Sequence, residues 1–276
     1  RIMIICLIVV VFVVVVVAVV LVVVIVVVVV VVIVVVEEAI LVIIIEIPEI
    51  TKNQVSDKDS EAVKSWKYIS NALYRENGQR NYILKGLDLA NNDDMILISD
   101  VDEIPNLENL QLSKIQEKII LFKQDMFYYK FNLKLPNLDW TGTKGCKKKF
   151  LKSPQWLRNI KDRKYPFYRL DTFFSDTKYV NIKIISNGGW HFSNLKTASE
   201  IEFKLKSYLH HREFDENPLS VEEINDLIKN KQAIYDLKVD KRVNKIGDGS
   251  KLEKYPSDKL PKFLQDNLND YKQWID

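Results

Sequence analysis

The first 36 residues limit most strongly what this chain can fold into. Ile2–Val36 contains no charged, amide or hydroxyl side chain, and 23 of the 28 residues in Val9–Val36 are valine. An apolar run of this length is long enough to cross a bilayer. As one helix, however, its 35 residues would extend about 52 Å, well beyond a hydrocarbon core of about 30 Å. Valine also favours β-structure, because its branched side chain packs well on a pleated surface.

Residues 1–36 therefore have two structural interpretations: core strands that belong to the following domain, or a membrane anchor. Their near-uniform composition also fits a third interpretation, in which valine stands in for natural residues that were not identified. Arg1 is the one basic residue beside the run, so the flanking charge says little about which end of an anchor would face the cytoplasm. We treat residues 1–36 as a separate tract and residues 37–276 as the functional domain. The protein is then expected to be cytoplasmic, or membrane-associated if residues 1–36 are an anchor.

The rest of the chain alternates between strand-like and helix-like segments, which predicts an α/β domain. Strands are expected at Ile40–Ile47, Met95–Ser99, Ile119–Tyr129 and Tyr179–Ser186, and a capping box at Ser220–Glu223 begins a helix. Helical periodicity over Ala62–Leu73 predicts a helix that breaks at Asn77-Gly78. Pro136–Lys164 is basic and is expected to be mostly loop.

Two carboxylates follow the strand Met95–Ser99, which is apolar up to Ile98. Asp100 and Asp102 stand two residues apart, directly after the strand. Ligands of open α/β sheets bind outside the carboxyl ends of the strands. Mg²⁺ and Mn²⁺ prefer oxygen ligands and often share them with substrate phosphates. The pattern therefore predicts a divalent cation held at this turn, against the plainer interpretation of an exposed acidic turn.

Composition excludes other classes of protein. Charged residues make up 28% of the chain and the net charge is only +3, so no strong field attracts nucleic acid. The two cysteines, Cys6 and Cys146, make no disulfide framework and have no zinc-ligand spacing.

Several separated motifs, in the same order, resemble those of glycosyltransferase family 17. They are Arg75–Leu87, Asp94–Pro105, Gly188–Ser193, His211–Phe214 and the C-terminal Leu260–Trp274. The resemblance covers roughly Ile45 to the C-terminus. It departs from the family at the N-terminus, where the valine tract stands in place of the family's first strands.

The resemblance implies a GT-A-like mixed sheet flanked by helices in a single α/β domain. It also implies a UDP-sugar donor, namely UDP-N-acetylglucosamine, a glycan or glycoprotein acceptor, Mn²⁺ or Mg²⁺ as cofactor, and inversion at the anomeric carbon. Inversion requires one general base to take the proton of the acceptor hydroxyl. Glu213, in a family-like motif, is the first candidate and Asp171 the second.

Other side chains have expected roles in binding. Arg80 and Asp100 are expected to bind the donor, and His191 to contact either the metal or the diphosphate, with Gly188-Gly189 allowing close approach of the backbone. The predicted metal ligands are thus Asp100, Asp102 and His191. Trp140, Trp156 and Trp190 are candidate faces for acceptor sugars, although a core or lid role suits each of them equally.

Two rival functions remain at this point. A haloacid-dehalogenase-type phosphatase also places Asp-x-Asp after an apolar strand, and Gly247-Asp248-Gly249 resembles a later motif of that family. Ile104 stands where that family has Thr or Ser, which counts against it. The second rival is a membrane-tethered, non-catalytic sugar-binding protein that uses the tryptophans and a structural cation.

Overall fold

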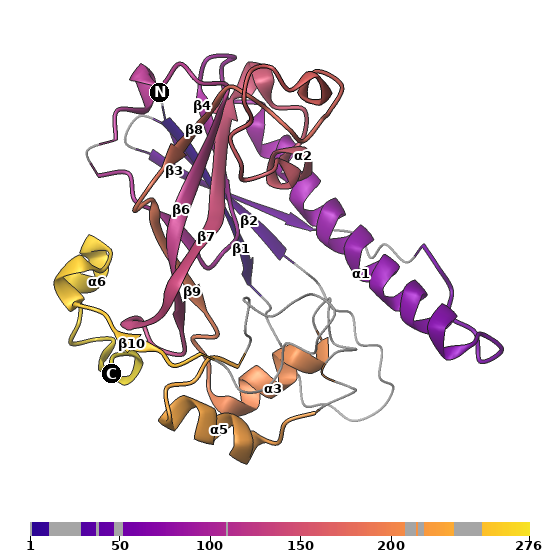
Figure 1. The fold of residues 1–276 in the computed structure, drawn as a ribbon, viewed down its shortest axis with the longest axis vertical. Helices are drawn as coiled ribbons and strands as arrows, with labels where there is room; N and C mark the ends of the chain where they lie inside the picture. Colours follow the sequence, from indigo (N-terminus) through magenta and orange to yellow (C-terminus); the bar gives the residue numbers. More distant parts are fainter. Residues whose placement is uncertain are drawn as a thin grey trace.

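The computed structural model describes the backbone of residues 2–10, 29–36, 39–46, 52–108, 110–207, 214, 218–234 and 250–276, and the side chains of those from residue 52 onward. Within these ranges the strands form one mixed sheet of ten, in the order β3-β2-β1-β4-β7-β6-β9-β5, with β10 beside β7 and β8 beside β6 (Figure 1). This mixed sheet with flanking helices confirms the predicted GT-A-like α/β class.

The strands are β1 (Ile2–Val10), β2 (Val29–Val36), β3 (Ala39–Glu46), β4 (Met95–Ser99), β5 (Glu103–Pro105), β6 (Ile119–Tyr128), β7 (Leu133–Lys147), β8 (Ile182–Ile185), β9 (Gly189–Ser193) and β10 (Glu253–Lys254). The α-helices are α1 (Glu61–Tyr82), α2 (Pro154–Asn159), α3 (Ala198–Ser207), α5 (Val221–Lys229) and α6 (Lys262–Asp266). Short 3₁₀ turns are η1 (Ile83–Leu87), η2 (Leu112–Lys114), η3 (Lys148–Phe150), η4 (Leu170–Thr172), η5 (Ser257–Lys259) and η6 (Lys272–Trp274).

The described parts of the valine tract are strands of this sheet. β1 runs parallel to β4, with Ile2 opposite Met95 and Cys6 opposite Ser99. β2 pairs antiparallel with both β1 and β3. Among the helices that the structure describes, none combines the length and the apolar character needed to cross a membrane.

Strand β4 is buried along its whole length because both faces of the sheet are covered there. Ile96 and Ile98 pack in a core cluster with Ile83 and Leu87 of η1, next to α2. Met95 and Leu97 face the other way and pack in a cluster around Leu112 and Phe122. A strand that is buried on both faces has no polar alternation, which explains the apolar run Met95–Ile98.

Helix α1 differs from the prediction. The expected break at Asn77-Gly78 is wrong, because α1 continues to Tyr82. One glycine costs a helix only about 1 kcal/mol relative to alanine. Tertiary contacts beyond the glycine offset that cost, since Arg80 in the last turn contacts Asp100 and Gln155. Figure 1 shows α1 extending away from the sheet, with α2 beside the end of α1 that reaches it.

The prediction that Pro136–Lys164 is mostly loop is also wrong. β7 runs for 15 residues and pairs with β4 on one side and β6 on the other. The register between β6 and β7 shifts near Asp125 and Phe127, and Pro136 lies in the resulting gap between paired positions. A proline is tolerated at such an irregularity because no ladder hydrogen bond is required there. Pairing on both sides overrides the basic composition that suggested a loop.

The other predicted elements are confirmed within a few residues. The predicted strands correspond to β3, β4, β6 and β8. The predicted capping box begins α5, with the Ser220 hydroxyl and the Glu223 carboxylate each accepting a backbone N–H of the other residue.

Candidate functional site

A tight turn after β4 carries three neighbouring carboxylates. The Glu103 N–H donates to the Asp100 carbonyl at 3.0 Å, and the Asp100 N–H donates to Glu103 Oε2 at 3.0 Å. The chain then enters β5, where Glu103 lies opposite His191 of β9. The turn therefore places Asp100, Asp102 and Glu103 at the carboxyl end of β4, as the sequence predicts.

Glu103 is buried in an ion pair with Arg158 of α2. Its side chain is 1% exposed and that of Arg158 is 10% exposed. Arg158 Nη1 and Nη2 donate to the two Glu103 oxygens at 2.7 and 2.9 Å, and Nη1 also donates to the Gly142 carbonyl at 2.6 Å. Burial alone would lower the pKa of Arg158, but the charges of Asp100 and Glu103 outweigh it and raise that pKa. The pair thus fixes α2 against the turn.

Both oxygens of Asp100 face arginines. Arg80 Nη2 lies 3.2 Å from Oδ1, and Arg158 Nη2 lies 2.8 Å from Oδ2. Arg80 also donates to Glu76 at 2.8 Å and to Gln155, so it joins α1, α2 and the turn. The predicted donor-binding pair Arg80 and Asp100 is therefore brought together in the structure.

Asp102, in the turn before β5, pairs with His191 of β9. His191 Nε2 lies 3.2 Å from Asp102 Oδ2, and the Asp102 carbonyl accepts the Phe192 N–H at 2.8 Å. Burial raises the pKa of Asp102, but the His191 hydrogen bond and the nearby charges of His191 and Lys204 outweigh this, so its pKa lies below the ordinary value. About a third of the Asp102 side chain remains exposed, so a ligand can reach it.

The geometry of this pair suits a divalent cation. Neighbouring ligands on an octahedral Mg²⁺ with bonds of about 2.0–2.1 Å are about 3.0 Å apart, close to the observed 3.2 Å between Asp102 Oδ2 and His191 Nε2. No group of three His, Cys, Asp or Glu side chains converges as a metal site in the part of the chain that the structure describes. Mg²⁺ is commonly held by one or two carboxylates and takes its other ligands from phosphates and water. Asp102 and His191 therefore fit the cation better than Asp100, whose oxygens face arginines.

The three predicted acceptor tryptophans lie in different places. Trp140 is beside the carboxylates: its Nε1 donates to Glu103 Oε1 at 2.8 Å, and its ring centroid is 5.1 Å from that of His191. Trp190 points to the other face of the sheet, where its Nε1 donates to the Lys259 carbonyl at 3.0 Å. Trp156 lies in the core cluster under α2 and donates to the Asp176 carbonyl at 2.7 Å. Only Trp140 thus lies at the carboxylate cluster.

Of the two predicted bases, the structure describes only Asp171, and it lies outside the cluster. Asp171 sits in η4, where Arg169 contacts both its oxygens at 2.7 and 2.9 Å and Lys178 contacts it at 2.9 Å. Hydrogen bonds from these two cations hold the pKa of Asp171 well below its usual range. Glu213 and the neighbouring His211 lie outside the described residues, as does the Gly247-Asp248-Gly249 motif.

The glycine pair before Trp190 serves close packing between strands. The Gly188 N–H donates to the Lys123 carbonyl at 2.6 Å, and the Gly188 carbonyl accepts the Asn106 N–H at 2.8 Å. Gly189 has φ +129°, and a Cβ there would lie 2.1 Å from the Ile104 carbonyl oxygen. Glycine is needed here so that β9 can approach β5, and this approach sets His191 opposite Glu103.

Sequence reasoning missed Arg158, the structural role of Glu103, and Lys204. Lys204 of α3 is half-buried, donates to Asn194 at 2.8 Å and contributes positive charge at Asp102. The Ser153-Pro154 start of α2 is a recognisable signal, since Ser153 accepts the Trp156 N–H at 3.0 Å and proline suits the first turn. It predicts a helix that carries Arg158, but not the direction of its guanidinium group.

The model of glycosyltransferase family 17 matches residues 49–275, which is most of the chain. Searches of curated proteins and of solved structures found no match.

Proposed function

The chain belongs to glycosyltransferase family 17, and from that premise we propose that it transfers N-acetylglucosamine from UDP-N-acetylglucosamine to a glycan with inversion, using a divalent cation held by Asp102 and His191. Family membership makes the chain an enzyme that acts on a sugar donor and a glycan acceptor. It therefore sets aside the non-catalytic sugar-binding protein and the phosphatase. The donor nucleotide, the cation and the stereochemistry are the proposed part.

The observation that carries the proposal is the position of Asp102 and His191. They lie 3.2 Å apart at the carboxyl end of the central strand β4, with a third of the Asp102 side chain exposed. A bound Mg²⁺ or Mn²⁺ there would stabilise the charge that develops on a diphosphate leaving group. Asp102 and His191 would hold the ion, while Arg80, Arg158 and Glu103 fix the turn that presents Asp102.

Of the two candidate bases, Asp171 is poorly suited. A general base works best with a pKa near the working pH, and the cations around Asp171 hold its pKa far below that. Glu213 is therefore the preferred base in this proposal. We expect Glu213→Gln to lower turnover by about 100-fold or more and Asp171→Asn to leave it nearly unchanged.

The direct test measures UDP release from UDP-N-acetylglucosamine by the intact chain, with Mn²⁺, with Mg²⁺ and with EDTA. We expect release only with a cation, and its loss in Asp102→Asn and His191→Ala. Asp93→Asn is the matched control, because Asp93 is an exposed carboxylate at the other end of β4, paired with Lys149. UDP-glucose and UDP-galactose test the choice of sugar.

Calorimetric titration of Mn²⁺ separates binding from turnover. We expect Asp102→Asn and His191→Ala each to weaken Mn²⁺ binding by 10-fold or more, while Asp93→Asn does not. Cation-independent UDP release, or Mn²⁺ binding that is unchanged in both variants, would contradict the proposed metal site. An axial anomeric product from an axial donor would contradict inversion.

A further inference from the structure

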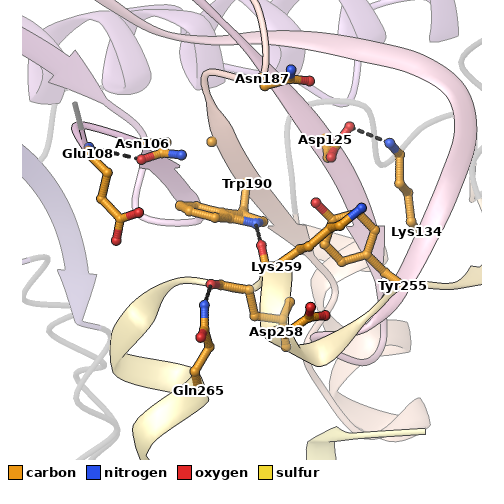
Figure 2. A pocket seen from close by; sticks show the side chains of 12 residues that line it. Asn106, Glu108, Asp125, Lys134, Asn187, Trp190, Tyr255, Asp258, Lys259 and Gln265 are labelled. Atoms are coloured by element: carbon orange, nitrogen blue, oxygen red, sulfur yellow. Dashed lines mark hydrogen bonds and ion pairs between the residues drawn. The ribbon is translucent and has the colours of Figure 1, made fainter. Parts of the chain in front are cut away.

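A cavity of about 470 Å³ lies beside β9 and the C-terminal segment. It is lined by Asn106, Glu108, Asp125, Lys134, Asn187, Gly189, Trp190, Tyr255, Asp258, Lys259, Leu260 and Gln265. Figure 2 shows the Trp190 indole in the middle, with Asn106 and Glu108 on one side and Tyr255 on the other. The volume falls within the range of small-molecule sites, about 300–1,000 Å³.

The cavity is on the opposite face of the sheet from the carboxylate cluster. Successive side chains of a strand point to opposite faces, so Trp190 and His191 of β9 point apart. In the register of the sheet, Trp190 is paired with Ile104 and Asp125, whereas His191 is paired with Glu103 and Met126. The cavity is thus separate from the proposed donor site, although both are built on β5 and β9.

The cavity wall is held in place by its own contacts. Trp190 donates to the Lys259 carbonyl at 3.0 Å, which ties η5 to β9. Asp125 pairs with Lys134 at 2.5 Å and accepts a hydrogen bond from Tyr255. Tyr255 in turn packs edge-on against Phe127, with ring centroids 5.1 Å apart. The aromatic surfaces are therefore fixed before any ligand binds.

The polar lining suits a ligand with many hydroxyl groups. Asn106, Asn187 and Gln265 carry amides, which both donate and accept, while Glu108 and Asp258 accept. A hydroxyl can match either kind of partner, whereas a cation can use only the acceptors. The charge of Lys134 is matched by Asp125, which leaves two carboxylates against Lys259. This balance disfavours a phosphate or another anion.

We infer that this cavity binds a neutral sugar unit of the acceptor glycan, with Trp190 and Tyr255 as its aromatic wall and Asp258 and Glu108 as hydrogen-bond acceptors at its rim. The assignment of the sugar to the acceptor rests on the proposed function, but the binding of a neutral sugar does not. A glycan held here lies beside β5, the strand at the edge of the sheet where its two faces meet.

The test records ¹H–¹⁵N spectra of the whole chain with EDTA present, and follows the indole N–H signal of Trp190, assigned with Trp190→Phe. Chitobiose, lactose and maltose are the neutral probes, and tetramethylammonium is the cationic probe. We expect at least one disaccharide to shift this signal to saturation. Asp258→Ala and Glu108→Ala should each weaken that binding 5-fold or more. Asp270→Ala, an exposed carboxylate outside the cavity, is the matched control and should leave it unchanged.

Three results would overturn the inference: no shift with any disaccharide, equal affinity in Asp258→Ala and wild type, or a response to tetramethylammonium alone. UDP release is measured on the same samples, so the two proposals fail separately. A chain that releases UDP but binds no disaccharide at Trp190 loses this inference alone. A chain that binds the disaccharide but never releases UDP loses the proposed function instead.

Discussion

Replacing Arg158 with methionine tests whether the buried ion pair holds the site together. Arg158 makes four polar contacts: two to Glu103, one to Asp100 and one to the Gly142 carbonyl. Methionine retains much of the side-chain volume but removes the charge. Glu103 would then keep two partners, Trp140 Nε1 and the Asp100 N–H, with no cation beside it.

The expected cost follows from the burial of both partners. Removing one member of a buried pair leaves an uncompensated charge, which typically costs about 3–5 kcal/mol. Glu103 at 1% exposure places Arg158→Met in that range. Glu103→Gln should cost less, about 1.5–3 kcal/mol, because Arg158 retains Asp100. The double variant should cost at least about 1 kcal/mol less than the sum of the two, since the partners are in direct contact.

Urea unfolding at pH 7 measures these costs from the transition midpoint at constant slope. Arg169→Met is the control, because Arg169 makes the same two-point contact with Asp171 at the surface. Exposed pairs contribute little, so this variant should unfold with wild type. Losses of unfolding free energy in Arg158→Met and Glu103→Gln that add up in the double variant would refute this reasoning. An Arg158→Met protein as stable as the Arg169→Met protein would refute it as well.

Three further predictions concern single residues. Burial lowers the pKa of Lys144 to about 8, so from pH 8 to 10 the unfolded chain holds a proton that the native state lacks. As the pH rises from 8 to 10, the free energy of unfolding should then increase relative to that of Lys144→Met, by at most about 1.4 kcal/mol per pH unit. A difference in unfolding free energy between the two proteins that stays constant across that range would contradict this prediction. A Cβ on Gly142 would lie 1.7 Å from Gln124 Oε1, so Gly142→Ala should cost about 1–3 kcal/mol, whereas Gly78→Ala within α1 should gain up to about 1 kcal/mol by the same assay. Burial raises the pKa of Cys146 to about 12, so iodoacetamide at pH 8 should modify Cys146 only in denaturant; peptide mapping that finds it labelled in the native protein would show that the thiol is accessible.

The sequence predicted those features whose cause is local. β4 could be predicted because Met95–Ile98 are four apolar residues in a row with no solvent-facing position, and the strand is covered on both sides. The carboxylates after it follow directly from where the strand ends. The capping box of α5 could likewise be predicted, because it needs only Ser220 and Glu223, three positions apart.

What the sequence did not predict depends on distant partners. β7 has a basic, proline-containing sequence, and its strand form comes from pairing with β4 and β6. Arg158 is 55 residues from Glu103, and only the fold places its guanidinium on that carboxylate. The same holds for Trp190: its position beside His191 in sequence suggests one site, yet strand alternation sends the two rings to opposite faces.

That alternation gives β9 a role in both proposed sites. Gly189 must be glycine for β9 to approach β5, and this approach determines the register that pairs His191 with Glu103 and Trp190 with Ile104. A shift of one residue would exchange the two faces, because the side-chain period of a strand is two. His191 would then leave Asp102, and Trp190 would leave the cavity. The proposed metal pair and the proposed sugar cavity are therefore not independent: one strand register produces both, and a change at Gly189 should impair both together.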